Sequence, residues 1–399
     1  MARLRSRDLF PTDDPIPAHR MIGRGDDIEE LARSLGNGVH RIIAGPRRTG
    51  KTSVGHAALE RLRAQGHYVV AVDLFEVSDA GELAEALVAA TIANRPAVYK
   101  ALHKLRRAGD IARKTADTAA VMKLKGELGE EIEFVVRPGG AAQDPDRFLR
   151  YALQIPQRVA EADERQLVLF LDEFQEIARE SGPYGDPDVV TKRLRAVAQK
   201  SPRVTFLFAG SLEHLMRDLF TSRRRAFFQF GSFLELTPIP PEDWREGLRA
   251  RFAEDGCSID DYALARLVEL GELHPRATML IAQQTHDASV AFATQEIDSM
   301  LVEQGFATAR AGDRPNHELT VTRIRDWRNG TNAMGVAKRV ARGEPTYGDL
   351  EPKTAQRAVN ALRDAGIIES TRRGEWRITD PLLRRYLAEL EPTRRVVES

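Results

Sequence analysis

One stretch near the N-terminus constrains the fold more than any other, Gly45-Pro46-Arg47-Arg48-Thr49-Gly50-Lys51-Thr52. It follows a short apolar run and precedes a segment with a helical pattern, which is the strand–loop–helix setting of a G-x-x-x-x-G-K-[ST] phosphate loop. Gly45 and Gly50 allow a tight turn close to a phosphate. Backbone N–H groups at a helix N-terminus bind anions. We expect 45–53 to bind a nucleotide, with Lys51 reaching its β- and γ-phosphates and the Thr52 hydroxyl ligating Mg²⁺.

A second nucleotide motif lies at 167–173, where the apolar run Leu-Val-Leu-Phe-Leu ends in Asp172 and Glu173. A buried parallel strand presents such acids at its carboxyl end, where open α/β sheets bind their ligands. Alone, the two acids could simply terminate a strand. Behind a phosphate loop, Asp172 is expected to hold Mg²⁺, and Glu173 to orient or deprotonate an attacking water.

Two further apolar runs, 68–74 and 204–211, have the character of buried strands. A strand, the loop, a helix and a second strand within about 35 residues form a right-handed βαβ unit, so the sheet is expected to be parallel. Ser211 closes the second run. It is either a polar group beside the γ-phosphate or the N-cap of the following helix.

Composition narrows the function classes. The chain has 399 residues, 30% of them charged, and a formal net charge of zero, so any contact with nucleic acid has to come from a local patch. Its single cysteine, Cys257, allows neither an internal disulfide nor a cysteine-based zinc cluster. The N-terminus lacks the apolar segment of a signal peptide, and no run approaches the roughly 18 apolar residues that span a bilayer. A cytoplasmic protein is expected.

Proline-rich and polar segments divide the sequence into four predicted parts. These are an extended lead-in at 1–20, a core at 21–238, a helical bundle at 239–312 and a C-terminal module at 313–399. Within the core, 146–162 is predicted to be one helix. The bundle is predicted to hold four helices, the third beginning at Pro275, where the missing N–H is not needed, and the last covering 295–309. The polar segment 311–316 is predicted to separate the bundle from the last module.

A basic stretch at 95–125 belongs to an insertion of about 95–140 that is predicted to be helical. The stretch contains nine Lys and Arg residues and only two Asp residues. It is either a binding patch for duplex DNA or a protein partner, or a solvated helical face. Three arginines at 223–225 leave a similar choice, between an arginine finger and a cap on a helix end.

The C-terminal module combines a helix at 352–365 with a hairpin that turns at Gly374 and a closing helix after Asp380. This order predicts a winged helix. Its basic side chains would lie on the helix that enters a major groove and on the wing: Lys353, Arg357, Arg363, Arg372 and Arg373. Winged helices also serve as protein-contact domains, so duplex DNA and a protein partner are both retained.

The chain resembles the AAA+/STAND-type ATPases, and among them the archaeal-type ATPases, distant relatives of the origin-recognition initiators. The residues that carry the resemblance are IGR at 22–24, GPRRTGKTS at 45–53, FLDEFQ at 170–175, FAGS at 208–211, LTPI at 236–239, GELHP at 271–275, LRDAGIIE at 362–369 and ITDPLLRRYL at 378–387. The resemblance implies a P-loop α/β fold with a five-stranded parallel core, a helical lid and a C-terminal winged helix.

The resemblance also implies roles for particular residues. The turn Ile22-Gly23-Arg24 would line the adenine side, and Ser211 would be the sensor beside the γ-phosphate. Gln175 would contact the site from the next helix. The lid helix that begins at Pro275 would face the nucleotide, with Arg276 as a second sensor. Relatives carry an arginine just before the last core strand, where this chain has Gln229-Phe230-Gly231, which leaves the arginine finger and ring assembly unassigned.

These observations predict an ATP- and Mg²⁺-dependent molecular switch, in which ATP bound between core and lid holds a closed state and hydrolysis releases it. Its catalytic residues would be Lys51, Glu173 and Ser211. The alternative is a DNA-binding protein that uses ATP as a structural or regulatory ligand. A small-molecule kinase is disfavoured, because Glu173 suits activation of water.

Overall fold

The computed structural model describes residues 4–12, 15–95, 120–125, 131–136, 145–178, 184, 186–348, 350–372 and 374–391. By their internal contacts, the residues form two compact units. One contains Asp26–Gly45 and Lys51–Leu236, and the other contains Met1–Gly25, Pro46–Gly50 and Thr237–Ser399. The predicted division into four parts stays a prediction.

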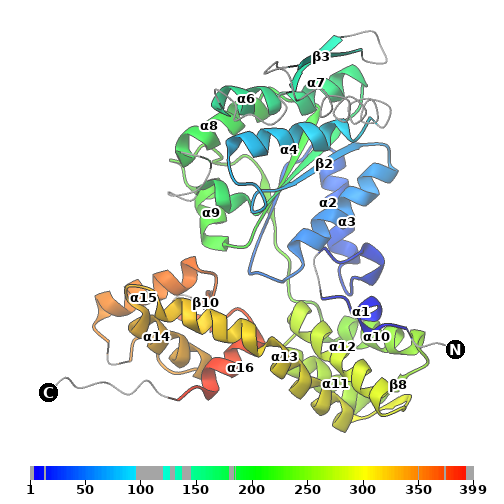
Figure 1. The fold of residues 1–399 in the computed structure, drawn as a ribbon, viewed down its shortest axis with the longest axis vertical. Helices are drawn as coiled ribbons and strands as arrows, with labels where there is room; N and C mark the ends of the chain where they lie inside the picture. The colour runs from blue at the N-terminus through cyan, green and yellow to red at the C-terminus, as the bar shows by residue number, and fades with distance from the viewer. Residues whose placement is uncertain are drawn as a thin grey trace, which may run out of the picture. The chain divides into compact units, whose positions relative to one another are not determined.

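The first unit is built on a five-stranded parallel sheet, as the resemblance predicted (Figure 1). The strand order is β2-β5-β6-β1-β7. Parallel neighbours pair in register throughout, for example Asp73 with Asp172 and Ala44 with Gly210. The strands are β1 (Arg41–Ala44), β2 (Tyr68–Asp73), β5 (Leu167–Asp172), β6 (Val204–Gly210) and β7 (Ser232–Leu234).

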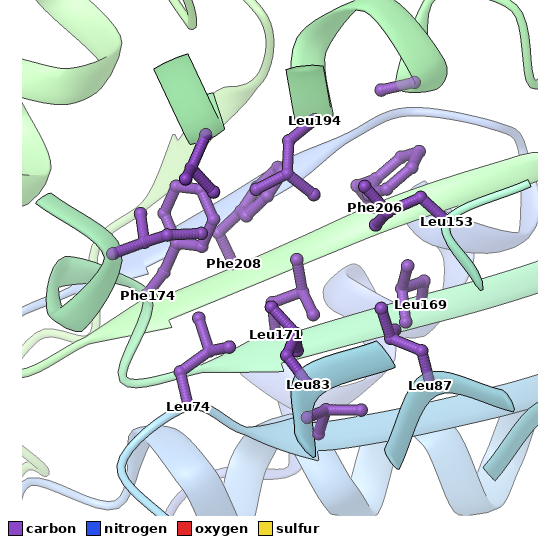
Figure 2. Packing of buried hydrophobic residues seen from close by; sticks show 14 of the residues in the cluster. Leu74, Leu83, Leu87, Leu153, Leu169, Leu171, Phe174, Leu194, Phe206 and Phe208 are labelled. Atoms are coloured by element: carbon purple, nitrogen blue, oxygen red, sulfur yellow. The ribbon is translucent and has the colours of Figure 1, made fainter. Parts of the chain in front are cut away.

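Helices cover the sheet because β5 and β6 are mostly apolar and are buried along their whole length. Alternate strand residues point to one face, where Leu169, Leu171 and Phe208 pack with Leu83 and Leu194 of two helices (Figure 2). The helices of this unit are α2 (Gly25–Gly36), α3 (Lys51–Ala64), α4 (Ala80–Ile92), α6 (Pro145–Ala152), α7 (Ile155–Ala162), α8 (Pro187–Ala198) and α9 (Glu213–Thr221), with the short 3-10 helix η2 (Phe174–Ala178).

Helix α3 packs on the other face of the sheet. A Cβ on Gly55 would lie 2.8 Å from the ring of Phe170, so only glycine lets the helix approach β5 this closely. This contact fixes the helix that follows the phosphate loop against the strand that carries Asp172.

The single helix predicted for 146–162 is wrong. Two helices, α6 and α7, replace it, with a turn between them. Pro156 lies in the first turn of α7, where its missing N–H is harmless, and proline disfavours a helical residue before it. The apolar spacing continues through the break, which is why the pattern alone gave one helix.

The basic insertion lies largely outside the described residues, including 96–119. The described part contains an antiparallel pair, β3 (Ala120–Lys125) and β4 (Glu131–Val136). The helical prediction for the insertion is wrong at 120–125, where Met122 and Leu124 alternate with two lysines in the pattern of a strand.

In the second unit, the N-terminal residues are not an extended lead-in. They form α1 (Ser6–Leu9) and the 3-10 helix η1 (Ala18–Arg20), and Leu9 and Phe10 are fully buried. The Phe10 ring lies 4.7 Å from that of Phe252, in a cluster that includes Trp244. Prolines and charged residues surround this short apolar pair in the sequence, so its contribution to a core was not predicted.

The next helices are α10 (Pro241–Glu254), α11 (Asp261–Gly271), α12 (Pro275–Ala291) and α13 (Ser299–Arg325), with the two-residue parallel strands β8 (Ser258–Ile259) and β9 (Glu296–Ile297). The separator predicted at 311–316 is wrong, because α13 runs through it with Pro315 inside. Asp313 is buried and paired with Arg276, so a polar residue that suggested a boundary is part of the packing.

The C-terminal segment contains α14 (Gly330–Arg342), α15 (Pro352–Asp364), the hairpin β10 (Ile368–Arg372) with β11 (Glu375–Ile378), and α16 (Pro381–Glu389). Gly374, with φ of 86°, lies at the hairpin turn. Asp380 caps α16 by accepting hydrogen bonds from the N–H groups of Leu382 and Leu383. The predicted helix, hairpin and closing helix are confirmed, and the winged-helix assignment stays a prediction.

Across the part of the chain that the structure describes, none of the helices combines the length and the apolar character needed to cross a membrane.

Candidate nucleotide site

The first unit gathers its polar groups at one edge of the sheet. Because all five strands are parallel, β1, β2, β5 and β6 end on the same side. Asp73 and Asp172 are register partners at the ends of β2 and β5, and Gly45 N–H donates to the Gly210 carbonyl at the ends of β1 and β6, 3.4 Å apart. This is the edge at which ligands of open α/β sheets bind.

Asp172 and Thr52, both predicted to ligate Mg²⁺, are in contact at this edge. Thr52 Oγ1 donates a hydrogen bond to Asp172 Oδ2 at 2.6 Å, and the Glu173 N–H donates to Asp172 Oδ1 at 2.9 Å. Asp172 is only 4% exposed, and burial raises its pKa to about 6, although both hydrogen bonds favour the ionised form. The carboxylate is therefore desolvated and in contact with a hydroxyl and an N–H.

Glu173 is held by two side chains from neighbouring elements. Ser211 Oγ donates to Glu173 Oε2 at 2.8 Å, and Gln175 Nε2 donates to the same oxygen. Gln175 Oε1 in turn accepts the Ser211 N–H at 3.1 Å. The backbone of Glu173 has φ of 48°, a left-handed conformation that turns the chain sharply at the end of β5. Ser211, offered as a sensor or an N-cap, is fixed here on the Glu173 carboxylate.

Two residues of this edge were not assigned roles from the sequence. A Cβ on Gly210 would lie 2.4 Å from Gln175 Oε1, so this glycine leaves the space that Gln175 occupies. Asp73 ends β2 as Asp172 ends β5, and burial raises its pKa, with the charge of Glu173 adding to the shift. The repeated pattern of an apolar strand ending in an acid could have identified Asp73.

The phosphate loop contains two residues with positive φ, one of them a glycine. Gly50 has φ of 91° and Arg48 has φ of 65°, while Thr49 Oγ1 donates to the Pro46 carbonyl at 2.9 Å. Lys51 and Ser53 open α3 as buried residues, 5% and 0% exposed. Arg47 and Arg48 are exposed.

By their contacts, residues Pro46–Gly50 belong to the second unit. Within that unit, Arg48 Nη1 lies 3.1 Å from Asp380 Oδ2.

The turn predicted to line the adenine side lies in the second unit. Gly23 has φ of 61°, and a Cβ there would lie 2.5 Å from Ile239. Ile22 is buried, and the equally buried Arg24 donates from Nη1 to the Thr237 carbonyl at 2.8 Å. The turn borders a cavity of about 360 Å³ that Ile22 and Gly23 line together with Gly247.

The predicted second sensor belongs to the second unit and is engaged there. Arg276 follows Pro275 at the start of α12, and its Nη1 and Nη2 donate to the two oxygens of Asp313 at 2.7 and 2.9 Å. Asp380 Oδ2 lies 3.9 Å from Arg276 Nη1. The preceding residue, His274, caps α12, and its burial lowers its pKa to about 4.

The donor set at the sheet edge fits a magnesium ion. Mg²⁺ takes oxygen ligands and is commonly held by one carboxylate, a hydroxyl and phosphate oxygens. Thr52 Oγ1 and Asp172 Oδ2 supply a hydroxyl and a carboxylate 2.6 Å apart, and burial raises the pKa of Asp172 to about 6. Thr52 and Asp172 are thus the residues that could hold the ion.

Comparison with solved structures gives the same fold. The Walker-type ATPase PABY2304 of Pyrococcus abyssi is 16% identical, with a TM-score of 0.65 over 95% of this chain and 99% of that one. The ORC2 protein of Aeropyrum pernix in ADPNP–ADP complexes is 15% identical, with a TM-score of 0.61 over 97% of each chain. Its ADP form is 14% identical, with a TM-score of 0.56 over 96% of this chain and 98% of that one.

No protein-family model matches the sequence, and no curated protein matches it either. The structural likeness establishes the fold: the chain has the architecture of these archaeal proteins, with the five-stranded parallel sheet that the resemblance predicted.

Proposed function

We propose that the protein binds ATP with Mg²⁺ at the carboxyl edge of the parallel sheet, hydrolyses it, and uses the nucleotide state to control the binding of a partner. The observation that carries this proposal is the connected set Thr52–Asp172–Glu173–Ser211, in which each member contacts the next at one strand edge. A cytoplasmic location is part of the proposal, supported by the single buried cysteine.

The loop supplies the phosphate-binding groups. The N–H groups at the start of α3 and the ammonium of Lys51 would hold the β- and γ-phosphates, since a helix N-terminus and a lysine at this position both favour anions. The ion held by Thr52 and Asp172 would neutralise phosphate charge when bound. The roles of Ile22–Arg24 and Pro275–Arg276 toward the nucleotide remain predictions.

Glu173 would orient the attacking water and accept its proton. Its Oε2 already accepts two hydrogen bonds, from Ser211 and Gln175, so the carboxylate has a defined direction and a second oxygen, Oε1, for a water. Ser211 and Gln175 would act as positioning residues that hold Glu173.

The test of binding is the affinity for ATP in the presence of Mg²⁺, measured by calorimetry. Lys51→Ala should weaken it by about 100-fold or more, because a charge-assisted contact to phosphate is lost. Lys200→Ala removes an exposed lysine two residues after the end of α8 and is the matched control, with unchanged affinity expected. Equal affinities in the two variants would remove the phosphate-binding role of the loop.

A second candidate is a DNA-binding protein that uses ATP as a ligand. Exposed Lys353 and Arg357 lie on α15, next to the hairpin β10–β11, in the order expected of a winged helix. Its test is the slope of log affinity for duplex DNA against log salt concentration. A slope that falls by about one in Lys353→Ala supports DNA contact by α15, and an undetectable affinity excludes it.

A further inference from the structure

A cluster of three different metal-ligating side chains lies in the second unit, apart from the nucleotide motifs. It consists of Asp255 at the C-terminus of α10, Cys257 two residues later, and His286 in α12. One ligand atom from each residue lies within 4.8 Å of the other two. The side chains of His286 and Asp255 are 0% and 5% exposed, and Cys257 is 4% exposed.

The imidazole of His286 is part of a chain of three short polar contacts. Its Nδ1 lies 2.7 Å from Ser6 Oγ, and its Nε2 lies 3.0 Å from Asp255 Oδ2. Ser6 Oγ also lies 2.5 Å from Asp287 Oδ1. The chain therefore runs from one carboxylate through a hydroxyl and an imidazole to a second carboxylate.

Three hydrogen bonds need three protons, and the neutral groups of this chain supply two. Ser6 carries one hydroxyl proton and a neutral imidazole carries one N–H, while ionised carboxylates carry none. If Ser6 donates to Asp287, His286 Nδ1–H donates to Ser6, and the lone pair of Nε2 then faces Asp255 Oδ2. A positive charge between Nε2 and Asp255 Oδ2, either a proton on the imidazole or a metal ion, completes this buried 3.0 Å contact.

We propose that this positive charge is a divalent metal ion of the zinc class, bound by His286 Nε2, Asp255 Oδ2 and Cys257 Sγ. Thiolate, imidazole and carboxylate together are the donor set of Zn²⁺. Two such ligands about 2.0–2.1 Å from a tetrahedral ion are about 3.3 Å from each other, close to the separation of Nε2 and Oδ2. On binding, a sulfur–metal bond forms and the thiol proton leaves to solvent, with no change of oxidation state.

The remaining contacts have the arrangement of an outer shell. A metal-bound histidine usually donates its other N–H to a carboxylate or a hydroxyl, which fixes the ring and its tautomer. Ser6 and Asp287 do this for Nδ1, and the Leu4 N–H donates to the second oxygen of Asp255 at 2.7 Å. An ion at this point would therefore tie the N-terminal helix α1 to α10 and α12.

The two rival interpretations of the cluster have different chemistry. In the first, a third proton makes His286 an imidazolium between two carboxylates, and Cys257 is a packing residue. In the second, Ser6, His286 and Asp255 would be a catalytic triad. The burial of His286 and the bond from Ser6 to Asp287 disfavour a nucleophilic serine, since its proton is committed to a carboxylate.

The test is a cobalt titration of the full-length protein after removal of metals with a chelator. Tetrahedral Co²⁺ absorbs in the visible, and a thiolate ligand adds a charge-transfer band in the near ultraviolet. We expect one equivalent of Co²⁺ to produce both features and Zn²⁺ to displace it. Cys257→Ser should abolish the charge-transfer band and weaken binding by about 100-fold, and Asp287→Asn, which leaves the three ligands intact, by about tenfold.

The control is Asp261→Asn, which removes a carboxylate whose side chain is 93% exposed in the same unit and should leave the titration unchanged. Circular dichroism of each metal-free variant identifies those that do not fold, and His286→Gln is the second ligand variant if Cys257→Ser fails. No stoichiometric binding, or a spectrum without the thiolate band in the wild type, overturns the proposal and leaves the imidazolium. These variants leave Lys51 unchanged, so their affinity for ATP can be measured independently of their affinity for the metal.

Discussion

Asp172 and Asp313 are equally buried, each 4% exposed, and their environments shift their pKa values in opposite directions. Burial raises the pKa of Asp172 to about 6, because its contacts with Thr52 and the Glu173 N–H do not offset the loss of water. Burial acts the same way on Asp313, but the hydrogen bonds and charge of Arg276 hold the pKa of Asp313 well below its usual value. Asp313 has its counter-charge within the chain.

The difference separates a structural carboxylate from one suited to a ligand. A buried carboxylate without a cation costs free energy, and a protein keeps such a group where function requires it. Of these two carboxylates, the costly one is Asp172, at the sheet edge beside the phosphate-loop helix. The comparison therefore supports the proposal that Asp172 receives its positive charge from a bound metal ion.

The largest effect is expected from breaking the paired carboxylate. Arg276→Ala would leave Asp313 buried without its guanidinium, and we expect the free energy of unfolding to fall by about 3–5 kcal/mol. Chemical denaturation measures this change. The double variant Arg276→Met with Asp313→Leu should recover most of the stability, because it removes both charges and keeps apolar volume. A single variant as stable as the wild type would show that Asp313 does not depend on Arg276.

At the sheet edge, removing the charge of the buried carboxylate is expected to raise the free energy of unfolding. Asp172→Asn removes a desolvated charge and keeps an oxygen for the Glu173 N–H, so the metal-free protein should gain about 1–3 kcal/mol of stability at neutral pH. Thermal or chemical denaturation in a chelator measures the gain. The same variant should lose the Mg²⁺-dependent part of ATP binding. A loss of stability comparable to that of Asp313→Asn would remove the contrast between the two carboxylates.

The pH dependence sharpens the contrast. The folded-state pKa of Asp172 is raised from 3.8 to about 6, so the folded protein binds the proton more tightly than the unfolded chain, and the stability from this group falls as pH rises from about 4 to 6. The pKa of Asp313 is lowered, so its contribution is present above the unfolded value of 3.8 and is lost as pH falls below it.

Unfolding of the metal-free wild type and of both asparagine variants between pH 4 and 7.5 measures these two contributions. The advantage of Asp172→Asn should shrink toward zero at pH 4. The deficit of Asp313→Asn should stay constant above about pH 5. Parallel pH profiles for the two variants would contradict the assignment.

The smallest effect is expected at Ser211. Removing its hydroxyl deletes one hydrogen bond to Glu173 Oε2 and leaves Gln175 in place, which corresponds to about 1 kcal/mol and about a fivefold to tenfold slower ATP turnover. The ATP affinity should not change, whereas a structural defect of the phosphate loop would alter it. An unchanged turnover rate would mean that Gln175 alone positions Glu173.

The residues of the sheet edge could be predicted because they follow local rules. A phosphate loop and an apolar strand ending in acids are contiguous in sequence, and parallel pairing then brings Thr52 to Asp172. The bond between Ser211 and Glu173 joins two strands 38 residues apart, and only the order β5–β6 makes them neighbours.

The residues of the second unit could not be predicted in the same way. Arg276 and Asp313 are 37 residues apart on two helices, and nothing local marks them as partners. Without that pair, the polar residues at 311–316 appeared to form a boundary, although they are part of α13. Leu9 and Phe10 are a core element of only two residues, too short to give a periodic pattern.

The central claim is that the sheet edge binds ATP and that Glu173 activates the water, and the most direct test compares ATP turnover in the wild type and in Glu173→Gln with Mg²⁺, beside their ATP affinities. The amide can accept the hydrogen bonds of Ser211 but cannot accept a proton. We expect unchanged affinity and turnover about 100-fold slower or more in Glu173→Gln. Hydrolysis at the wild-type rate by this variant would contradict the account.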